Sequence, residues 1–238
     1  FKIAQEGRQG PVLIDVPKDV TVHTADFVPQ VPEKLEPRTE RLSEKSMETA
    51  LDLIKHAQRP MCYVGGGVIR AKASEELSRF LENIDSPACT SLMGCGAVNS
   101  YSPRFTGLVG MHGTKVSNMC VSSCDLLVVI GARFSDRVVS KASSFAKNAK
   151  IIHIDVDPAE IDKNIKTYCH VVGDVKVVLD QLNKRIEKPM LHQGWMEQVA
   201  EYKKRYPIRV DSESARSKEI LKALQSVLPP NFFIVTEV

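Results

Sequence analysis

The sequence lacks the features that mark membrane, secreted and nucleic-acid-binding proteins. Its 238 residues contain no apolar run long enough to span a bilayer, and no signal peptide. The net charge is only +3, and the lysines and arginines form no basic block of the kind that binds nucleic acid. With 43% hydrophobic residues, the chain is expected to fold around a substantial core, with no membrane and no nucleic acid among its partners.

Metal-binding spacing is also absent. The six cysteines include no CxxC pair. Cys120 and Cys124 are spaced to share a helix face, but they lack histidine or acidic partners, so we predict no metal site. Reduced and mostly buried thiols are typical of a cytoplasmic protein, which is the predicted location. The chain has no initiator methionine and stops at Val238 directly after an apolar run, so we expect a fragment.

Buried-strand patterns alternate with helical periodicity along most of the chain. Leu126–Ile130 is continuously apolar and rich in β-branched residues, which is typical of a strand buried on both faces of a parallel sheet. We expect strands at residues 11–16, 61–64, 87–91, 126–130, 150–156, 170–172 and 231–238, and a loop at 93–110. We expect helices beginning near Ser43, Ala73, Lys115, Asp157, Asp174, Trp195 and Ser217. This order predicts an α/β fold with a doubly wound parallel sheet.

Two irregular segments interrupt this alternation. Pro29, Pro32 and Pro37 prevent regular structure in the first, and Pro189 lies in the second. We therefore place linkers at residues 23–41 and 187–194. They separate a self-contained unit at 42–186 from pieces of other units at 1–22 and 195–238.

Glycines and polar residues follow several of the expected strands. The Gly65–Gly67 turn resembles a loop whose amides approach a phosphate, although it lacks the GxGxxG spacing and a purely structural turn is the alternative. His112–Thr114 precedes a helix, whose N-terminus favours an anion. Packing or a surface hydrogen bond is the commoner role of a single histidine.

The later strands end in charge. Arg133 and Arg137 are suited to pairing with phosphate, and a solvated loop with surface ion pairs is the alternative. Asp155 closes a strand, where an acidic residue often accepts hydrogen bonds from ribose hydroxyls, whereas Asp157 is expected to cap a helix. Gly173-Asp174 again ends a strand and begins a helix. Because the carboxyl ends of parallel strands share one edge of a sheet, these residues together predict a dinucleotide site there.

Longer motifs resemble the large catalytic subunits of acetolactate synthases (acetohydroxyacid synthases), which are thiamine-diphosphate enzymes. The matching segments are GRQGPVLIDVPKDV at Gly7–Val20, TSLMGCGAV at Thr90–Val98, GMHGT at Gly110–Thr114, CDLLVVIGARFSDRV at Cys124–Val138 and KIIHIDVDPAEIDKN at Lys150–Asn164. They span most of the chain, and their combination is more specific than any single glycine motif. One departure is Ser135, where many members of the family carry a second aspartate.

The resemblance implies three α/β domains. Residues 1–22 would end the pyrimidine-binding domain, 42–186 would form a Rossmann-like central domain that binds FAD, and 195–238 would begin the diphosphate-binding domain. The FAD, structural in this family, would contact Arg8, Gly65, Gly66, Gly67, Ser91, Leu92, Met93, Met111, His112, Gly113, Thr114, Gly131, Ala132, Arg133, Arg137, Asp155, Val156, Gly173 and Asp174. The substrate channel would be lined by Lys18, Met111 and Asp136.

The resemblance also implies an activity. The parent enzyme would be a carboligase that condenses pyruvate with pyruvate or 2-oxobutyrate, with loss of CO2, in branched-chain amino-acid biosynthesis. Thiamine diphosphate and Mg²⁺ would be held mostly outside this chain, because the family's activating glutamate precedes Phe1 and its metal-binding motif follows Val238. We therefore expect no catalytic residue here, no turnover by the fragment alone and a weakened FAD site.

A homodimer or homotetramer and a regulatory small subunit are the implied partners of the parent enzyme. Two alternatives stay open. One is another thiamine-diphosphate enzyme, such as a pyruvate oxidase, in which the flavin is redox-active. The other is a non-catalytic nucleotide-binding module, because the central fold is shared with NAD-binding domains.

Overall fold

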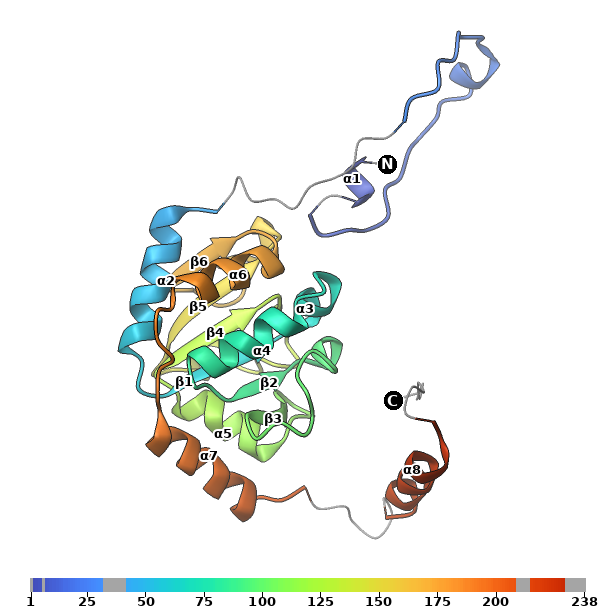
Figure 1. The fold of residues 1–238 in the computed structure, drawn as a ribbon. Coiled ribbons are helices and arrows are strands. Elements are labelled where there is room, and N and C mark those ends of the chain that lie inside the picture. The colour runs from blue at the N-terminus through green and yellow to red at the C-terminus, as the bar shows by residue number, and fades with distance from the viewer. Residues whose placement is uncertain (1, 6, 32–41, 209–214, 230–238) are drawn as a thin grey trace.

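The chain folds around a six-stranded parallel sheet (Figure 1). The computed structural model describes residues 2–5, 7–31, 42–208 and 215–229. The strands are β1 (Pro60–Val64), β2 (Ala88–Thr90), β3 (Phe105–Leu108), β4 (Leu126–Ile130), β5 (Lys150–Asp155) and β6 (Cys169–Val172). All neighbouring pairs are parallel, and their order is β3-β2-β1-β4-β5-β6. The predicted doubly wound parallel sheet is confirmed, in the strand order of the Rossmann fold.

Helices cover both faces of this sheet. Successive residues of a strand point to opposite faces, so in β1 Cys62 and Val64 enter one apolar core while Met61 and Tyr63 enter the other. The first core is covered by α2 (Glu44–His56), α3 (Gly66–Arg70), α4 (Ser74–Asn83) and α6 (Val175–Arg185). The second is covered by α5 (Lys115–Ser123) and α7 (Gln193–Arg205). Both faces are apolar, which explains why the strands read as continuous hydrophobic runs.

Most expected elements form, and α5 and β4 have the expected bounds. The loop expected at 93–110 is wrong in part, because it contains the short edge strand β3, which is half-buried and interrupted by Gly107. The helix expected from Asp157 is only a 3-10 turn, η4 (Pro158–Glu160). The turn ends because the next residue, Ile161, is extended, and Asp162 then has a positive φ of 58°. The strand expected at 231–238 lies outside the described residues.

The strand expected at residues 11–16 is also wrong. This segment is extended but pairs with no other described segment, and its apolar side chains are exposed, with Leu13 at 93%. Residues 11–31 project away from the sheet (Figure 1) and contain only the turn η1 (Val20–Val22) besides irregular chain. A strand needs a neighbour for its backbone hydrogen bonds, and the described chain offers none here. The short helix α1 (Lys2–Gln5) precedes this segment.

Helix α7 begins within the expected second linker and packs on the central unit. The Trp195 side chain is 3% exposed, and its Nε1–H donates to the Pro60 carbonyl at 2.8 Å. Just before the helix, the backbone N–H of His192 donates to Asp85 Oδ2 at 2.6 Å. Arg104 pairs with the other oxygen of the same carboxylate, also at 2.6 Å. The chain beyond residue 186 therefore contributes to the core of this unit; α8 (Ala215–Val227) follows.

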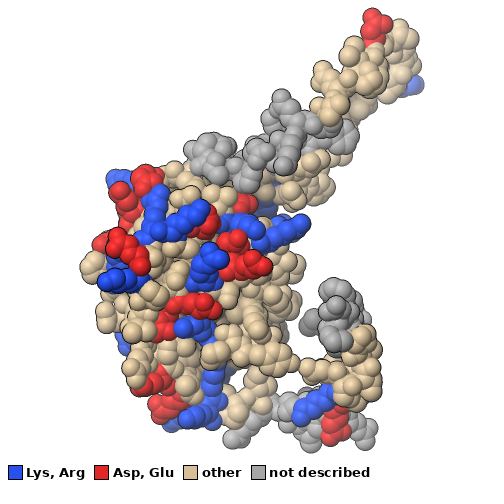
Figure 2. All heavy atoms as spheres, viewed as in Figure 1, with Lys and Arg blue, Asp and Glu red and all other residues tan. Residues whose placement is uncertain are grey.

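Charges of both signs alternate over the face that carries α2, α4 and α6 (Figure 2). Lys176 lies 3.4 Å from Glu76, and the Arg185 guanidinium pairs with Glu44. No helix of the described residues is long and apolar enough to cross a membrane.

Candidate functional site

The loops that follow the six strands meet at the carboxyl edge of the sheet. This edge carries most of the residues predicted to contact a dinucleotide: Gly65–Gly67 after β1, Ser91–Met93 after β2, Met111–Thr114 after β3, Gly131–Arg133 and Arg137 after β4, Asp155–Val156 at the end of β5, and Gly173–Asp174 after β6. In an open α/β sheet, ligands bind at this edge where the strand order reverses, which here is between β1 and β4.

Glycine residues of two loops are in contact where the strand order reverses. The Gly65 N–H donates to Ile130 O at 2.9 Å, and the Gly67 N–H donates to Gly131 O at 3.0 Å. A Cβ at Gly65 would lie 2.2 Å from the Gly131 carbonyl oxygen, and a Cβ at Gly67 would lie 2.7 Å from Gly131 Cα. These glycines are therefore needed for contact between the two loops, which is a structural role for the turn; its contact with a phosphate stays a prediction.

The loop after β3 is fastened to the loop after β4. Asn118 on α5 accepts from the Gly110 N–H at 2.9 Å and donates to the Gly110 carbonyl at 3.0 Å. The next residue, Met111, donates its N–H to Arg137 O at 2.9 Å. Gly110 has a φ of 102°, and a Cβ there would lie 2.6 Å from Arg137 O. The side chains of Met111 and Asp136, two predicted channel residues, are exposed on these joined loops.

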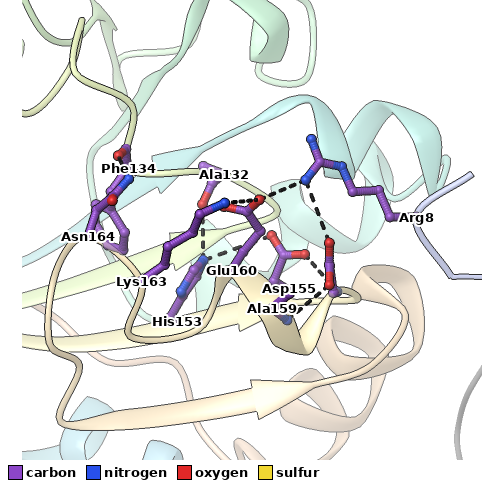
Figure 3. Close-up of polar contacts among 10 residues, drawn as sticks. Arg8, Ala132, Phe134, His153, Asp155, Ala159, Glu160, Lys163 and Asn164 are labelled. Carbon is purple, nitrogen blue, oxygen red and sulfur yellow. Dashed lines mark hydrogen bonds and ion pairs between the residues drawn. The ribbon is translucent and has the colours of Figure 1, made fainter. Parts of the chain in front are cut away.

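Three side chains hold the carbonyl oxygens of residues 132–134. His153 Nε2 lies 3.0 Å from the first carbonyl, the Tyr63 hydroxyl donates to the second at 3.2 Å, and Asn164 Nδ2 donates to the third at 2.7 Å (Figure 3 shows His153 and Asn164). Sequence reasoning missed all three donors. A signal was present, because Tyr63 and His153 are polar residues within otherwise apolar strand patterns.

Burial controls the charges below this loop. It lowers the pKa of His153, whose side chain is fully buried and whose Nδ1 has no hydrogen-bond partner among the described residues. Burial also raises the pKa of Asp155. Two neighbours lower this pKa by a smaller amount: the Asp157 N–H, which donates to the carboxylate, and the nearby His153. His153 is therefore neutral, and because a carbonyl only accepts, its proton sits on Nε2.

Arg8 is brought to this edge from the N-terminal segment (Figure 3). Its Nη1 lies 2.8 Å from Glu160 Oε1 and 3.6 Å from Asp157 Oδ2. Glu160 is 7% exposed and is also 3.3 Å from Lys163. Sequence reasoning missed Glu160. A buried glutamate is unusual, and this one is stabilised by the two cations that face it. Lys18, by contrast, is exposed within the segment of residues 11–31, which projects away from the sheet (Figure 1).

Two predicted site residues, Thr114 and Asp174, have capping roles, and so does Asp157, which was expected to be a cap. Thr114 accepts from the Ser117 N–H at the start of α5, and Asp174 accepts from two backbone N–H groups of α6, as expected of a helix cap. Asp157 caps the η4 turn through the Ala159 N–H. No group of three potential metal ligands was found in the parts of the chain that the structure describes.

We expect Asp155→Asn to stabilise the chain near neutral pH. The wild-type carboxyl has a raised pKa when folded, so folding favours its protonated form. The stabilisation that the protonated carboxyl gives is present in full below its ordinary pKa of about 3.9. It is lost as the pH rises through the pKa of the folded state. Asparagine can keep the bond to the Asp157 N–H and carries no charge. Urea denaturation of both proteins at several pH values measures this: the advantage of the variant should vanish in acid, and an advantage independent of pH would contradict the argument.

The fold defines a Rossmann-like unit whose loops meet through their backbones at the carboxyl edge of the sheet. The chain belongs to the thiamine pyrophosphate enzyme family, because residues 47–182 match the family's central domain. It is 39% identical to the acetolactate synthase large subunit of Parasynechococcus marenigrum, over 100% of this chain and 40% of that protein. A probable acetolactate synthase large subunit of Methanococcus aeolicus is 40% identical, over 96% of this chain and 41% of its own length. The large subunit of acetolactate synthase isozyme 2 of Escherichia coli is 37% identical, over 100% and 43%.

Proposed function

We propose that this chain forms the central part of an acetolactate synthase large subunit. The observation that supports this is its identity of 37 to 40% to such subunits over at least 96% of the chain. The chain spans 40 to 43% of the length of these relatives. The complete enzyme would condense pyruvate with a second 2-oxo acid and release CO2, with thiamine diphosphate and Mg²⁺ held mainly by residues outside this chain.

We further propose that the carboxyl edge of the sheet binds FAD. The residues fit this group: Arg8, Arg133 and Arg137 supply positive charge for a diphosphate, and Leu92 and Met93 expose apolar surface, at 66% and 70%, for a flat ring. The Asp155 carboxylate ends β5, where a ribose hydroxyl donor is usually met. The bound FAD would supply structural support rather than redox chemistry.

The contact of Arg8 with Glu160 and Asp157 limits how readily Arg8 can bind a phosphate of FAD. A phosphate that takes Arg8 as its partner must compete with both carboxylates for the same guanidinium. The Arg8 side chain is 38% exposed, but Glu160 is buried, so release of Arg8 to a phosphate would leave Glu160 with Lys163 as its remaining cation among the described residues. The predicted weakening of FAD binding in this chain is consistent with that competition.

The names of the relatives, as large subunits, support a regulatory small subunit as a partner. A homodimer or homotetramer, 2-oxo acid substrates, the domain boundaries at 22, 42, 186 and 195, and the cytoplasmic location remain predictions.

Two measurements test the proposal. Titration of the purified chain with FAD, followed by flavin fluorescence, should give saturable binding that an excess of NAD does not displace. Displacement by NAD would favour the nucleotide-binding module instead. The complete protein should form acetolactate from pyruvate, thiamine diphosphate and Mg²⁺ without bleaching of the flavin. Flavin reduction during turnover would favour an oxidase, and acetolactate formation by this chain alone would contradict the placement of the catalytic residues outside it.

A further inference from the structure

We propose that Tyr63, His153 and Asn164 are positioning residues, which hold the loop at residues 132–135 so that its backbone N–H groups face the diphosphate of a bound FAD. This inference rests on the FAD site proposed above and names the part of the chain that would recognise the ligand's anionic centre.

The first step is the direction of the carbonyl groups. His153 and Tyr63 reach the loop from β5 and β1, beneath it on the sheet, and Asn164 reaches it from the chain after η4. The ring of Phe134 packs on the same side, with its centroid 5.2 Å from that of His153 and 6.4 Å from that of Tyr63. Three successive carbonyl oxygens are thus directed toward side chains of the protein.

The second step concerns the N–H groups. In a planar trans peptide, the C=O of one residue and the N–H of the next point in opposite directions. With the carbonyls of residues 132–134 fixed by side chains, the N–H groups of residues 133–135 must point away from those side chains. None of these three N–H groups donates a hydrogen bond to another described residue. Backbone N–H groups without a partner among the described residues are available to donate hydrogen bonds to an anion.

The third step is the chemistry of the donors. Burial lowers the pKa of His153 and raises that of Tyr63, so one donor is a neutral imidazole and the other a protonated phenol. Neither side chain adds a buried charge below the loop. The positive charge at the site comes from Arg133 and Arg137, which are exposed and flank the free amides. Neutral donors beneath the loop and exposed arginines within it suit a diphosphate, because a diphosphate accepts hydrogen bonds and pairs with cations.

The test removes one donor at a time. Tyr63→Phe deletes only the hydroxyl, and His153→Leu deletes the ring donor, while His153→Gln retains an N–H near the position of Nε2. Loss of one hydrogen bond that orients the loop should weaken FAD binding about threefold to tenfold, with partial or full rescue in His153→Gln. Tyr206→Phe is the matched control, because Tyr206 packs on the same core but caps α7 far along the chain; it should bind FAD like wild type.

Hydrogen exchange followed by mass spectrometry locates the effect in the 238-residue chain. FAD should slow exchange of the amides at residues 133–135 in wild type and Tyr206→Phe, and this protection should be smaller in Tyr63→Phe. Circular dichroism establishes that each variant is folded. If FAD binds but leaves these amides unprotected, or if Tyr63→Phe and His153→Leu bind as tightly as wild type, the inference is overturned and the FAD site stands. If the chain binds no FAD at all, both are overturned.

Discussion

Replacement of Gly65 by alanine is expected to lower the free energy of unfolding by about 3 kcal/mol or more, at the upper end of the cost of overpacking a core. The added Cβ would lie 2.2 Å from the Gly131 carbonyl oxygen and 2.5 Å from Ala132 Cα. Both are backbone atoms of the loop after β4, so no side chain can rotate away. Relief requires separation of β1 and β4 at the edge, with loss of the bond from the Gly65 N–H to Ile130 O.

Gly194→Ala is the matched control. Gly194 lies in the first turn of α7, and nothing lies within 4 Å of a Cβ built on it. Since alanine is the better helix former, this change is expected to be neutral or to stabilise by up to about 1 kcal/mol. Guanidinium denaturation followed by circular dichroism measures both variants. Equal stability of Gly65→Ala and wild type would show that the two loops do not touch as the structure describes.

The second large effect is expected for Trp195→Ala. The indole is almost fully buried against the second core, and truncation of a buried tryptophan costs about 3–5 kcal/mol. Trp195→Phe keeps most of the apolar volume and loses the hydrogen bond to Pro60 O, so it should cost less, about 1 kcal/mol for the bond plus a packing loss. Thermal unfolding followed by circular dichroism compares the three proteins.

This pair of variants also tests where the central unit ends. If α7 belonged only to a following domain, Trp195→Ala would leave the unfolding of residues 42–186 unchanged. A clear loss of stability in the main transition is the expected outcome. Trp195 is the only tryptophan of the sequence, so intrinsic fluorescence of the wild type reports directly on the docking of this helix.

Much of this fold could be predicted from the sequence because strands buried on both faces leave a strong pattern. Leu126–Ile130 is continuously hydrophobic, and its predicted bounds match those of β4. Strand β3 lies at the sheet edge and has a glycine among its four residues, so its hydrophobic pattern is too short and too polar to detect. The segment at 11–16 failed for the opposite reason. Its pattern is that of a strand, but a strand also requires a neighbour, and no local pattern reveals whether one exists.

The sequence predicts which edge of the sheet carries the candidate site, but it does not predict which side chains hold the loops there. Strand ends identify which loops meet, so the placement of Gly131, Arg133 and Asp155 at this edge could be predicted from the sequence alone. The residues that shape the loops come from elsewhere in the chain: Tyr63 precedes the loop after β4 by about 70 residues, and Asn164 follows it by 30. Such partners depend on the register between strands, which a single sequence does not reveal.

The glycine contacts between β1 and β4 have a consequence for how ligand preference can change. Where Gly65 and Gly67 meet Gly131, the contact is made of main-chain atoms, and a Cβ added at any of these glycines would lie less than 3 Å from a backbone atom. The exposed side chains of Leu92, Met93 and Arg133 lie outside this contact and can vary without disturbing it, so a change in the preference of the proposed FAD site is expected to arise there.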